Sequence, residues 1–240
     1  MGDDRAVIRV KERSIMAVRK KKKAITSAEI IDKYMTYRLE SDRGPSNVYK
    51  FCKEAGIDEQ AFYAEFGSLH AIDRHIWDSL LATSIATATR DKAFAEYTDQ
   101  EKLLAVLFVF FENLTLNRSY VLLNLDHNRS IRDKVELFRH MKKTYGQFID
   151  EVFEGSPMDM LRTEVMRLDD ARKRAYREGF WTQLMFLIEF WRKDDSRGFE
   201  KTDIAIEKSV RAAMDLLDTS PFSSIIDFGK FLWKESARAF

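Results

Sequence analysis

Hydrophobic positions recur along most of the chain at intervals of three and four residues, which is the spacing of one helix face. Val48, Phe51, Cys52 and Ala55 are a compact case, at positions i, i+3, i+4 and i+7. Only 9 Gly and 3 Pro interrupt the 240 residues, and a β-rich protein of this length needs more residues of that kind for its turns. The pattern therefore predicts an all-α protein.

Local signals place the first and fourth helices of the N-terminal part. Thr26 and Glu29 have the spacing of a capping box, in which each side chain accepts a backbone N–H at the start of a helix. Gly44-Pro45 ends this first helix. Ser68 is a candidate N-cap for the fourth helix, at about 69–90.

Two short helices are predicted between these. Val48–Ala55 forms the second, and Gly56 follows it as a residue that tolerates the left-handed conformation at a helix C-terminus. Ile57 can tuck under this turn, and Asp58 is a plausible N-cap for a third helix that ends at Phe66. Short helices joined by such a tight turn indicate a helix-turn-helix. The alternative from the residues alone is any small three-helix bundle.

The chain changes character after residue 90. Its longest apolar run, Leu103–Phe111, has nine residues, whereas a membrane-spanning helix needs about 20. We therefore expect a buried core helix and no transmembrane segment. The helices predicted in this larger part lie at about 99–117, 130–153, 169–193, 200–218 and 221–237.

Charge is concentrated at the N-terminus. Residues 1–25 contain nine Lys or Arg and three acidic residues, although the whole chain has a formal net charge of only +1. We expect a basic flexible arm that either contacts phosphates or serves as a solubilising tail. The single cysteine, Cys52, rules out a disulfide within the chain and fits a reducing compartment. No apolar secretory segment is visible in the first 25 residues, so we expect a cytoplasmic protein.

The segment Glu29–Trp77 resembles the DNA-binding domain of the TetR family of bacterial transcriptional regulators. The resemblance is carried by the positions Asn47-Val48, Ala55-Gly56-Ile57, Phe62-Tyr63, Phe66 and Ser68. It implies a helix-turn-helix domain followed by a larger helical domain that encloses an apolar ligand and dimerises through its last two long helices. It also implies a repressor that binds palindromic double-stranded DNA as a homodimer.

The recognition helix departs from the family pattern in its charge. Asp58–Ala61 stands where the family usually has Lys or Arg, and Leu69 replaces a family lysine. Residues 46–69 contain two basic and four acidic side chains, which disfavours binding to phosphates, although a carboxylate can accept from cytosine N4. Tyr63 either donates to a phosphate or is a half-buried packing residue. The predicted DNA-binding residues are Lys21, Lys22, Lys23, Asn47, Glu59, Gln60 and Tyr63.

Aromatic residues are abundant in the larger part of the chain. They supply either an apolar ligand pocket or an ordinary core and dimer interface. The predicted ligand-binding residues are Phe108, Phe111, Phe180, Trp181 and Met185.

These patterns give a domain organisation and two functional hypotheses. We expect a basic arm at 1–25, a helix-turn-helix domain at 26–72 and a ligand-binding and dimerisation domain at 73–240. The first hypothesis is a ligand-responsive regulator, and the alternative is a TetR-fold protein that has lost DNA binding and serves as a lipid or isoprenoid carrier or accessory protein. No GxGxxG, phosphate-loop or HExxH motif is present, so we expect no enzymatic activity, cofactor or metal site.

Overall fold

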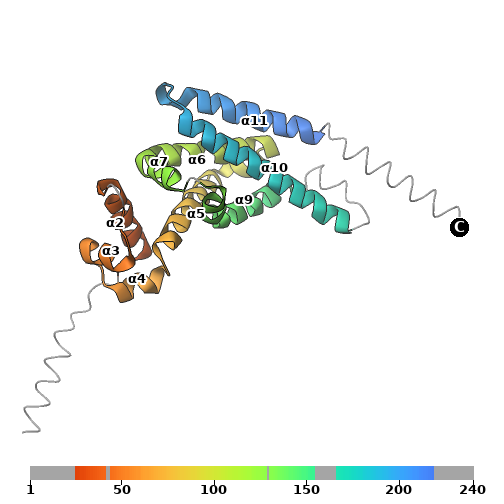
Figure 1. The fold of residues 1–240 in the computed structure, drawn as a ribbon. Coiled ribbons are helices and arrows are strands. Elements are labelled where there is room, and N and C mark those ends of the chain that lie inside the picture. The colour runs from red at the N-terminus through yellow and green to blue at the C-terminus, as the bar shows by residue number, and fades with distance from the viewer. Residues whose placement is uncertain (1–24, 42–43, 129, 155–165, 219–240) are drawn as a thin grey trace, which may run out of the picture. The chain divides into compact units, whose positions relative to one another are not determined.

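The structure is a computed structural model that describes residues 25–41, 44–128, 130–154 and 166–218. These residues form helices joined by short connections and contain no strand, so the all-α prediction is confirmed. Contacts between Cα atoms divide the chain between Ile72 and Asp73. We call the two parts the N-terminal unit and the C-terminal unit (Figure 1). The arm predicted at 1–25 lies almost wholly outside the described residues, and the helix predicted at 221–237 lies outside them altogether.

The N-terminal unit contains α2 (Ser27–Glu40), α3 (Val48–Ala55), α4 (Glu59–Glu65) and the start of α5 (Leu69–Ala88). The predicted capping box is present, because the Thr26 N–H donates to Glu29 Oε2 at 2.9 Å and the Glu29 N–H donates to Thr26 Oγ1 at 3.2 Å. The side chains that form the core of this unit are Ile30, Tyr34, Phe51, Cys52, Ile57, Phe62, Phe66 and Ile72.

Gly56 makes the turn between α3 and α4. Its φ of 67° and ψ of 35° lie in the left-handed region, and its N–H donates to the carbonyl of Cys52. The Ile57 N–H donates to the same carbonyl at 2.8 Å, and the Ile57 side chain is buried. The turn therefore closes α3 and carries the chain directly into α4, as the sequence predicts.

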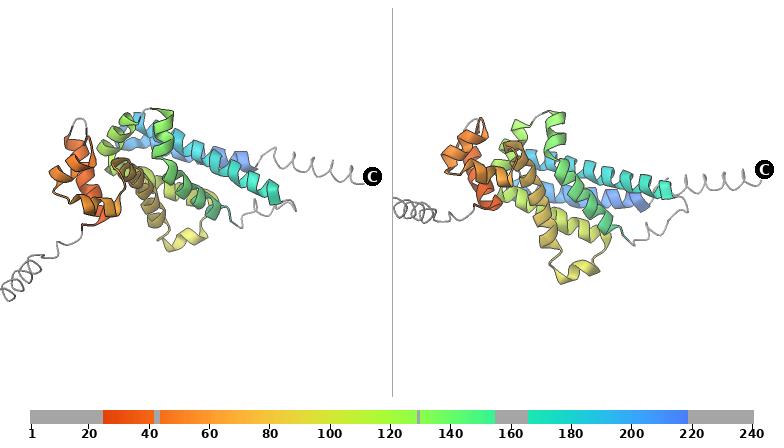
Figure 2. Two further views of the ribbon diagram at one scale, coloured as in Figure 1. Left: turned by 60° about the horizontal axis from the view of Figure 1, so that its bottom comes forward. Right: turned by 90° about the horizontal axis from the view of Figure 1, so that it is seen from below.

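The C-terminal unit is built mainly from α10 (Met166–Lys193) and α11 (Glu200–Asp218), which lie side by side in all views (Figures 1 and 2). Helix α9 packs against α10, and α6 packs against α11. The other elements are the part of α5 that follows Ile72, the 3-10 turns η1 (Lys92–Glu96) and η2 (Arg197–Phe199), and the helices α6 (Asp99–Leu116), α7 (Arg118–His127), α8 (Ile131–Leu137) and α9 (Arg139–Val152).

Two features of this unit differ from the predicted helices. The segment predicted as one helix at 130–153 is divided into α8 and α9 at Phe138, whose buried ring makes an edge contact with Trp77 at 4.9 Å between centroids. Helix α7 was not predicted, because α6 bends into it at Asn117 without a Gly or Pro. No single described helix is long and apolar enough to span a membrane, although α6 and α7, bent by 87°, pass that test as a pair.

A buried polar network crosses the core of the C-terminal unit. Asp73 Oδ1 accepts from the Tyr120 hydroxyl at 2.7 Å and from Asn124 Nδ2 at 2.8 Å. The Trp77 indole N–H donates to Asn124 Oδ1 at 3.0 Å. Because buried polar groups are costly when unpaired, this network favours one arrangement of α5 against α7.

Candidate functional site

Helix α4 separates its apolar and polar side chains clearly. Phe62 is fully buried, whereas Tyr63 is 53% exposed and Gln60 is exposed. The Tyr63 ring contacts Phe62 edge-on, at 5.4 Å between centroids. The outer face of α4 thus presents two polar side chains that can donate and accept hydrogen bonds.

The other predicted DNA-binding residues lie on different elements and differ in how exposed they are. Asn47 is the exposed N-cap of α3, and its Oδ1 accepts from the Lys50 N–H at 2.8 Å. Glu59 is half-buried in the first turn of α4. Lys21, Lys22 and Lys23 lie outside the described residues. Sequence reasoning did not single out Tyr49, which is 60% exposed on α3.

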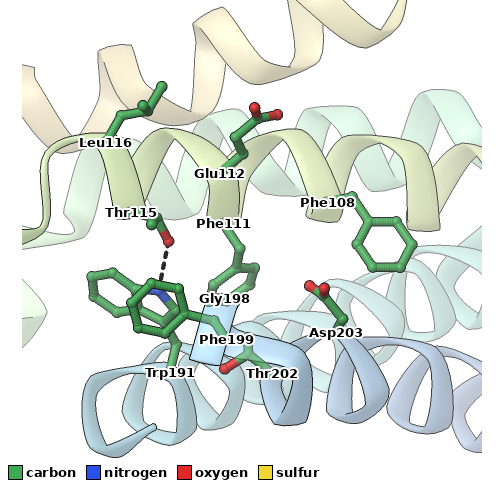
Figure 3. Close-up of a pocket in the computed structure, with 10 residues that line it drawn as sticks. All are labelled: Phe108, Phe111, Glu112, Thr115, Leu116, Trp191, Gly198, Phe199, Thr202 and Asp203. Carbon is green, nitrogen blue, oxygen red and sulfur yellow. Dashed lines mark hydrogen bonds between the residues drawn. The ribbon is translucent and has the colours of Figure 1, made fainter. Parts of the chain in front are cut away.

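A pocket of about 450 Å³ lies between α6 and the start of α11 (Figure 3). It is open to solvent and combines aromatic rings with two carboxylates. Its lining residues are Phe108, Phe111, Glu112, Thr115, Leu116, Trp191, Gly198, Phe199, Thr202 and Asp203.

One end of the pocket is held by Arg118 of α7. Its guanidinium lies 4.5 Å from the ring centroids of both Trp191 and Phe199. It also donates to the carbonyl oxygens of Trp191, Arg192 and Asp194 at 3.2–3.4 Å. A cation at a helix C-terminus satisfies carbonyls that have no partner within the helix, so Arg118 fixes the end of α10 together with the two rings.

Trp191 also connects α10 to α6. Its indole N–H donates to Thr115 Oγ1 at 3.0 Å, as Figure 3 shows. Trp191 is fully buried and Phe111 nearly so, whereas Phe108 and Phe199 are half-buried. The first pair therefore forms the floor of the pocket and the second pair its walls.

Phe199 has an unusual backbone conformation. Its φ is +61°, the only positive φ of a non-glycine among the described residues, and it follows Gly198 at +64°. A bulky residue in this region is strained, because its Cβ approaches the following carbonyl oxygen. The ring contacts with Trp191 and Arg118 hold the Phe199 side chain against the pocket despite that strain.

Asp203 occupies the other end of the pocket. In Figure 3 its carboxylate points toward α6, between the rings of Phe108 and Phe111, whereas Glu112 points away from those rings. Burial, followed by the nearby carboxylates of Glu207, Asp194 and Glu200, raises the pKa of Asp203. The pocket thus has an aromatic end at Trp191 and an acidic end at Asp203.

Asp194 positions the helix that carries Asp203. Its two carboxylate oxygens accept from the N–H and hydroxyl groups of Ser196 and Thr202, at 2.6–2.9 Å. Burial by itself would raise the pKa of Asp194, but these four hydrogen bonds outweigh it and lower the pKa to about 2. The ionised carboxylate therefore caps the start of α11.

The predicted ligand-binding residues are only partly brought together. Phe108 and Phe111 line the pocket. Phe180 instead stacks on Phe153 in the core, at 5.3 Å between centroids. Trp181 makes an edge contact with Phe138, and Met185 packs half-buried against the core.

Sequence reasoning missed the residues that the turn between α10 and α11 brings to the pocket, namely Phe199, Thr202 and Asp203. Gly198 was the available signal, because a glycine after a predicted helix marks a turn, and the residues beside that turn lie close to both helices. No group of three His, Cys, Asp or Glu side chains in the described part of the chain is arranged to hold a metal ion.

Comparison with protein families gives a match over residues 102–232, to the tetracyclin repressor-like C-terminal domain. This match covers more than half of the chain. The chain belongs to the TetR family. The family membership inferred from the helix-turn-helix residues is therefore confirmed by a different part of the molecule, and TetR proteins are typically regulators rather than enzymes. No curated protein matches the chain.

Proposed function

We propose that this TetR protein is a transcriptional regulator that binds palindromic DNA as a homodimer and releases it when an apolar ligand binds the C-terminal unit. The observation that carries the proposal is the outer face of α4, where Gln60 and Tyr63 are exposed beside the buried Phe62. A helix of this kind is held rigidly by its own core and can read base edges in a major groove. The domains 26–72 and 73–240 would then have the DNA-binding and ligand-binding roles.

Phosphate contacts in this proposal come largely from residues 1–25. Residues 25–72 contain eight acidic and five basic side chains, so this segment by itself repels DNA. Lys21, Lys22 and Lys23 would neutralise phosphates, while Asn47, Glu59, Gln60 and Tyr63 would set the register and contact bases.

The homodimer in this proposal is supported by apolar side chains exposed on α10 and α11. Phe186 is 57% exposed and contacts the ring of Phe190, and Ile204 and Leu216 are 50% and 66% exposed. Where such side chains form a continuous patch, they are typical of a surface that another chain covers. Two copies are also what a palindromic site requires.

Selection from a random duplex library, followed by footprinting, tests DNA binding. The full chain should enrich a palindrome and protect two half-sites about one helical turn apart. Gln60→Ala should change the preferred base at one position per half-site. Ala64→Ser, a mild change at a neighbouring exposed position of α4, is the matched control. Failure to enrich any sequence at low salt would overturn the proposal.

The excess of acidic side chains in residues 25–72 favours a second candidate function. A TetR-fold protein that no longer binds DNA can act as a lipid or isoprenoid carrier or an accessory protein, with its basic arm on an anionic membrane surface. Mass spectrometry of molecules that co-purify with the full chain discriminates between the two. A bound isoprenoid or phospholipid, without sequence-selective DNA binding, would favour this second function.

A further inference from the structure

The residues that line the pocket between α6 and α11 favour one sign of ligand charge, in addition to offering an apolar surface. Four aromatic rings contribute to its floor and walls, beside Thr115, Leu116, Gly198 and Thr202. The charged residues among those that line it, Glu112 and Asp203, are both acidic. Aromatic faces attract cations through their quadrupole, and a carboxylate beside them adds a full negative charge. An anionic ligand would meet repulsion from both features.

A bound cation is more favourable at one end of the pocket than at the other. At the Trp191 end, Arg118 already lies against the rings and repels a second cation. At the other end the Asp203 carboxylate lies beside Phe108 and Phe111 (Figure 3). Asp203 is largely exposed. Partial burial, followed by three nearby carboxylates, raises its pKa, so a cation at this end meets negative rather than positive charge.

We infer that this pocket binds an organic monocation with aromatic or alkyl substituents, its charge beside Asp203 and Phe108 and its apolar body against Trp191 and Phe199. The inference rests on the proposed function for its regulatory meaning, because it names the class of ligand to which the regulator responds. A pocket of about 450 Å³ has room for a molecule of drug-like size.

Tetraphenylphosphonium and tetraphenylborate are suitable probes, because they have the same shape and opposite charge. Calorimetric titration of the full chain without DNA should show binding of the phosphonium, and binding of the borate weaker by at least about tenfold, which corresponds to about 1.4 kcal/mol. Equal affinity for both ions would show a merely apolar site and would overturn the inference. Absence of phosphonium binding would overturn it as well.

Substitutions of Asp203 and Phe108 test whether the cation binds at this end of the pocket. Asp203→Asn should weaken phosphonium binding by about fivefold to tenfold, and Asp203→Lys should reverse the preference between the two ions. Glu151→Gln removes an exposed carboxylate from α9, away from the pocket, and should leave both affinities unchanged. Phe108→Ala should weaken phosphonium binding while the thermal unfolding profile stays cooperative. An Asp203→Asn variant that binds like the parent would overturn the placement.

DNA release is then measured separately. The phosphonium should dissociate the complex with the selected palindrome, and Asp203→Asn should need proportionally more of it. Phosphonium binding without any effect on DNA would contradict the regulatory mechanism and leave the site intact. DNA binding with no phosphonium binding would contradict the site and leave the regulator intact.

Discussion

The hydroxyl of Tyr120 donates to the buried carboxylate of Asp73 at 2.7 Å, and this bond joins α7 to α5 within the C-terminal unit. Tyr120 is 1% exposed and Asp73 is 3% exposed. A hydrogen bond to a buried charge contributes more to stability than one between neutral groups, because the carboxylate has no water to replace a lost donor.

Tyr120→Phe should therefore destabilise the protein by about 2 kcal/mol, within the range of about 1.5–3 kcal/mol for hydrogen bonds to charged groups. Urea unfolding followed by circular dichroism measures the change. An unchanged midpoint would show that Asn124 and other groups satisfy Asp73 without the phenol.

Replacing Tyr145 by phenylalanine should have the opposite effect on stability to Tyr120→Phe. It is also 1% exposed, but its hydroxyl has no hydrogen-bond partner among the residues that the structure describes, and burial raises its pKa strongly. Tyr145→Phe removes an unpaired buried hydroxyl, so the free energy of unfolding should rise by up to about 1 kcal/mol. A loss of stability equal to that of Tyr120→Phe would contradict this account of the two tyrosines.

Gly56→Ala should cost about 1 kcal/mol of stability, because an alanine with a φ of 67° brings its Cβ close to the next carbonyl oxygen. Beyond Gly56 and its two chain neighbours, no atom of the described residues lies within 4 Å of the added Cβ, so the cost comes from the local backbone conformation and not from a clash with the rest of the fold. Gly67→Ala is the matched control, since its surroundings are equally open and its φ is not positive. The control should be neutral or slightly stabilising, and equal losses at both positions would contradict the explanation.

Acid stability should depend on Asp194. Its pKa of about 2 in the folded protein lies below the ordinary value of about 3.9 for an unfolded chain, so the native state binds fewer protons. The carboxylate therefore stabilises the fold above about pH 4, and this contribution is lost as the pH falls toward 2. Urea unfolding between pH 2 and 5 should show a weaker pH dependence in Asp194→Asn than in the parent. Parallel curves would mean that other carboxylates, such as Glu189, account for the acid dependence.

The negative charge on α4 gives a prediction for the affinity of the full chain for DNA. Glu59→Gln removes one carboxylate from the first turn of α4, and affinity for a random duplex should rise because less charge opposes the phosphates. Fluorescence anisotropy at two salt concentrations measures it. Glu151→Gln, which changes the total charge equally but lies on α9, should leave affinity nearly unchanged. A comparable rise in both variants would mean that only total charge matters.

Local signals explain why the N-terminal unit could be predicted from the sequence almost to its helix ends. The capping box at Thr26 and the left-handed Gly56 depend on neighbouring residues alone. The division between α8 and α9 depends instead on Phe138 packing against Trp77, which periodicity cannot report. Only some of the residues that line the pocket could be predicted, because the others depend on how distant helices pack. Aromatic abundance indicated Phe108 and Phe111, but not that Phe180 on α10 turns into the core while Asp203 borders the cavity.

The left-handed backbone at Phe199 sets a strained main chain against the contacts that hold its ring beside the pocket. Moving this ring away from Arg118 would sacrifice a cation–π contact of about 0.5–2 kcal/mol. Relaxing the main chain would return a comparable amount, about 1–2 kcal/mol. The ring also contacts Trp191, and the guanidinium that holds it fastens the final turn of α10 as well. A ligand that displaces the Phe199 ring would therefore disturb the end of α10 too.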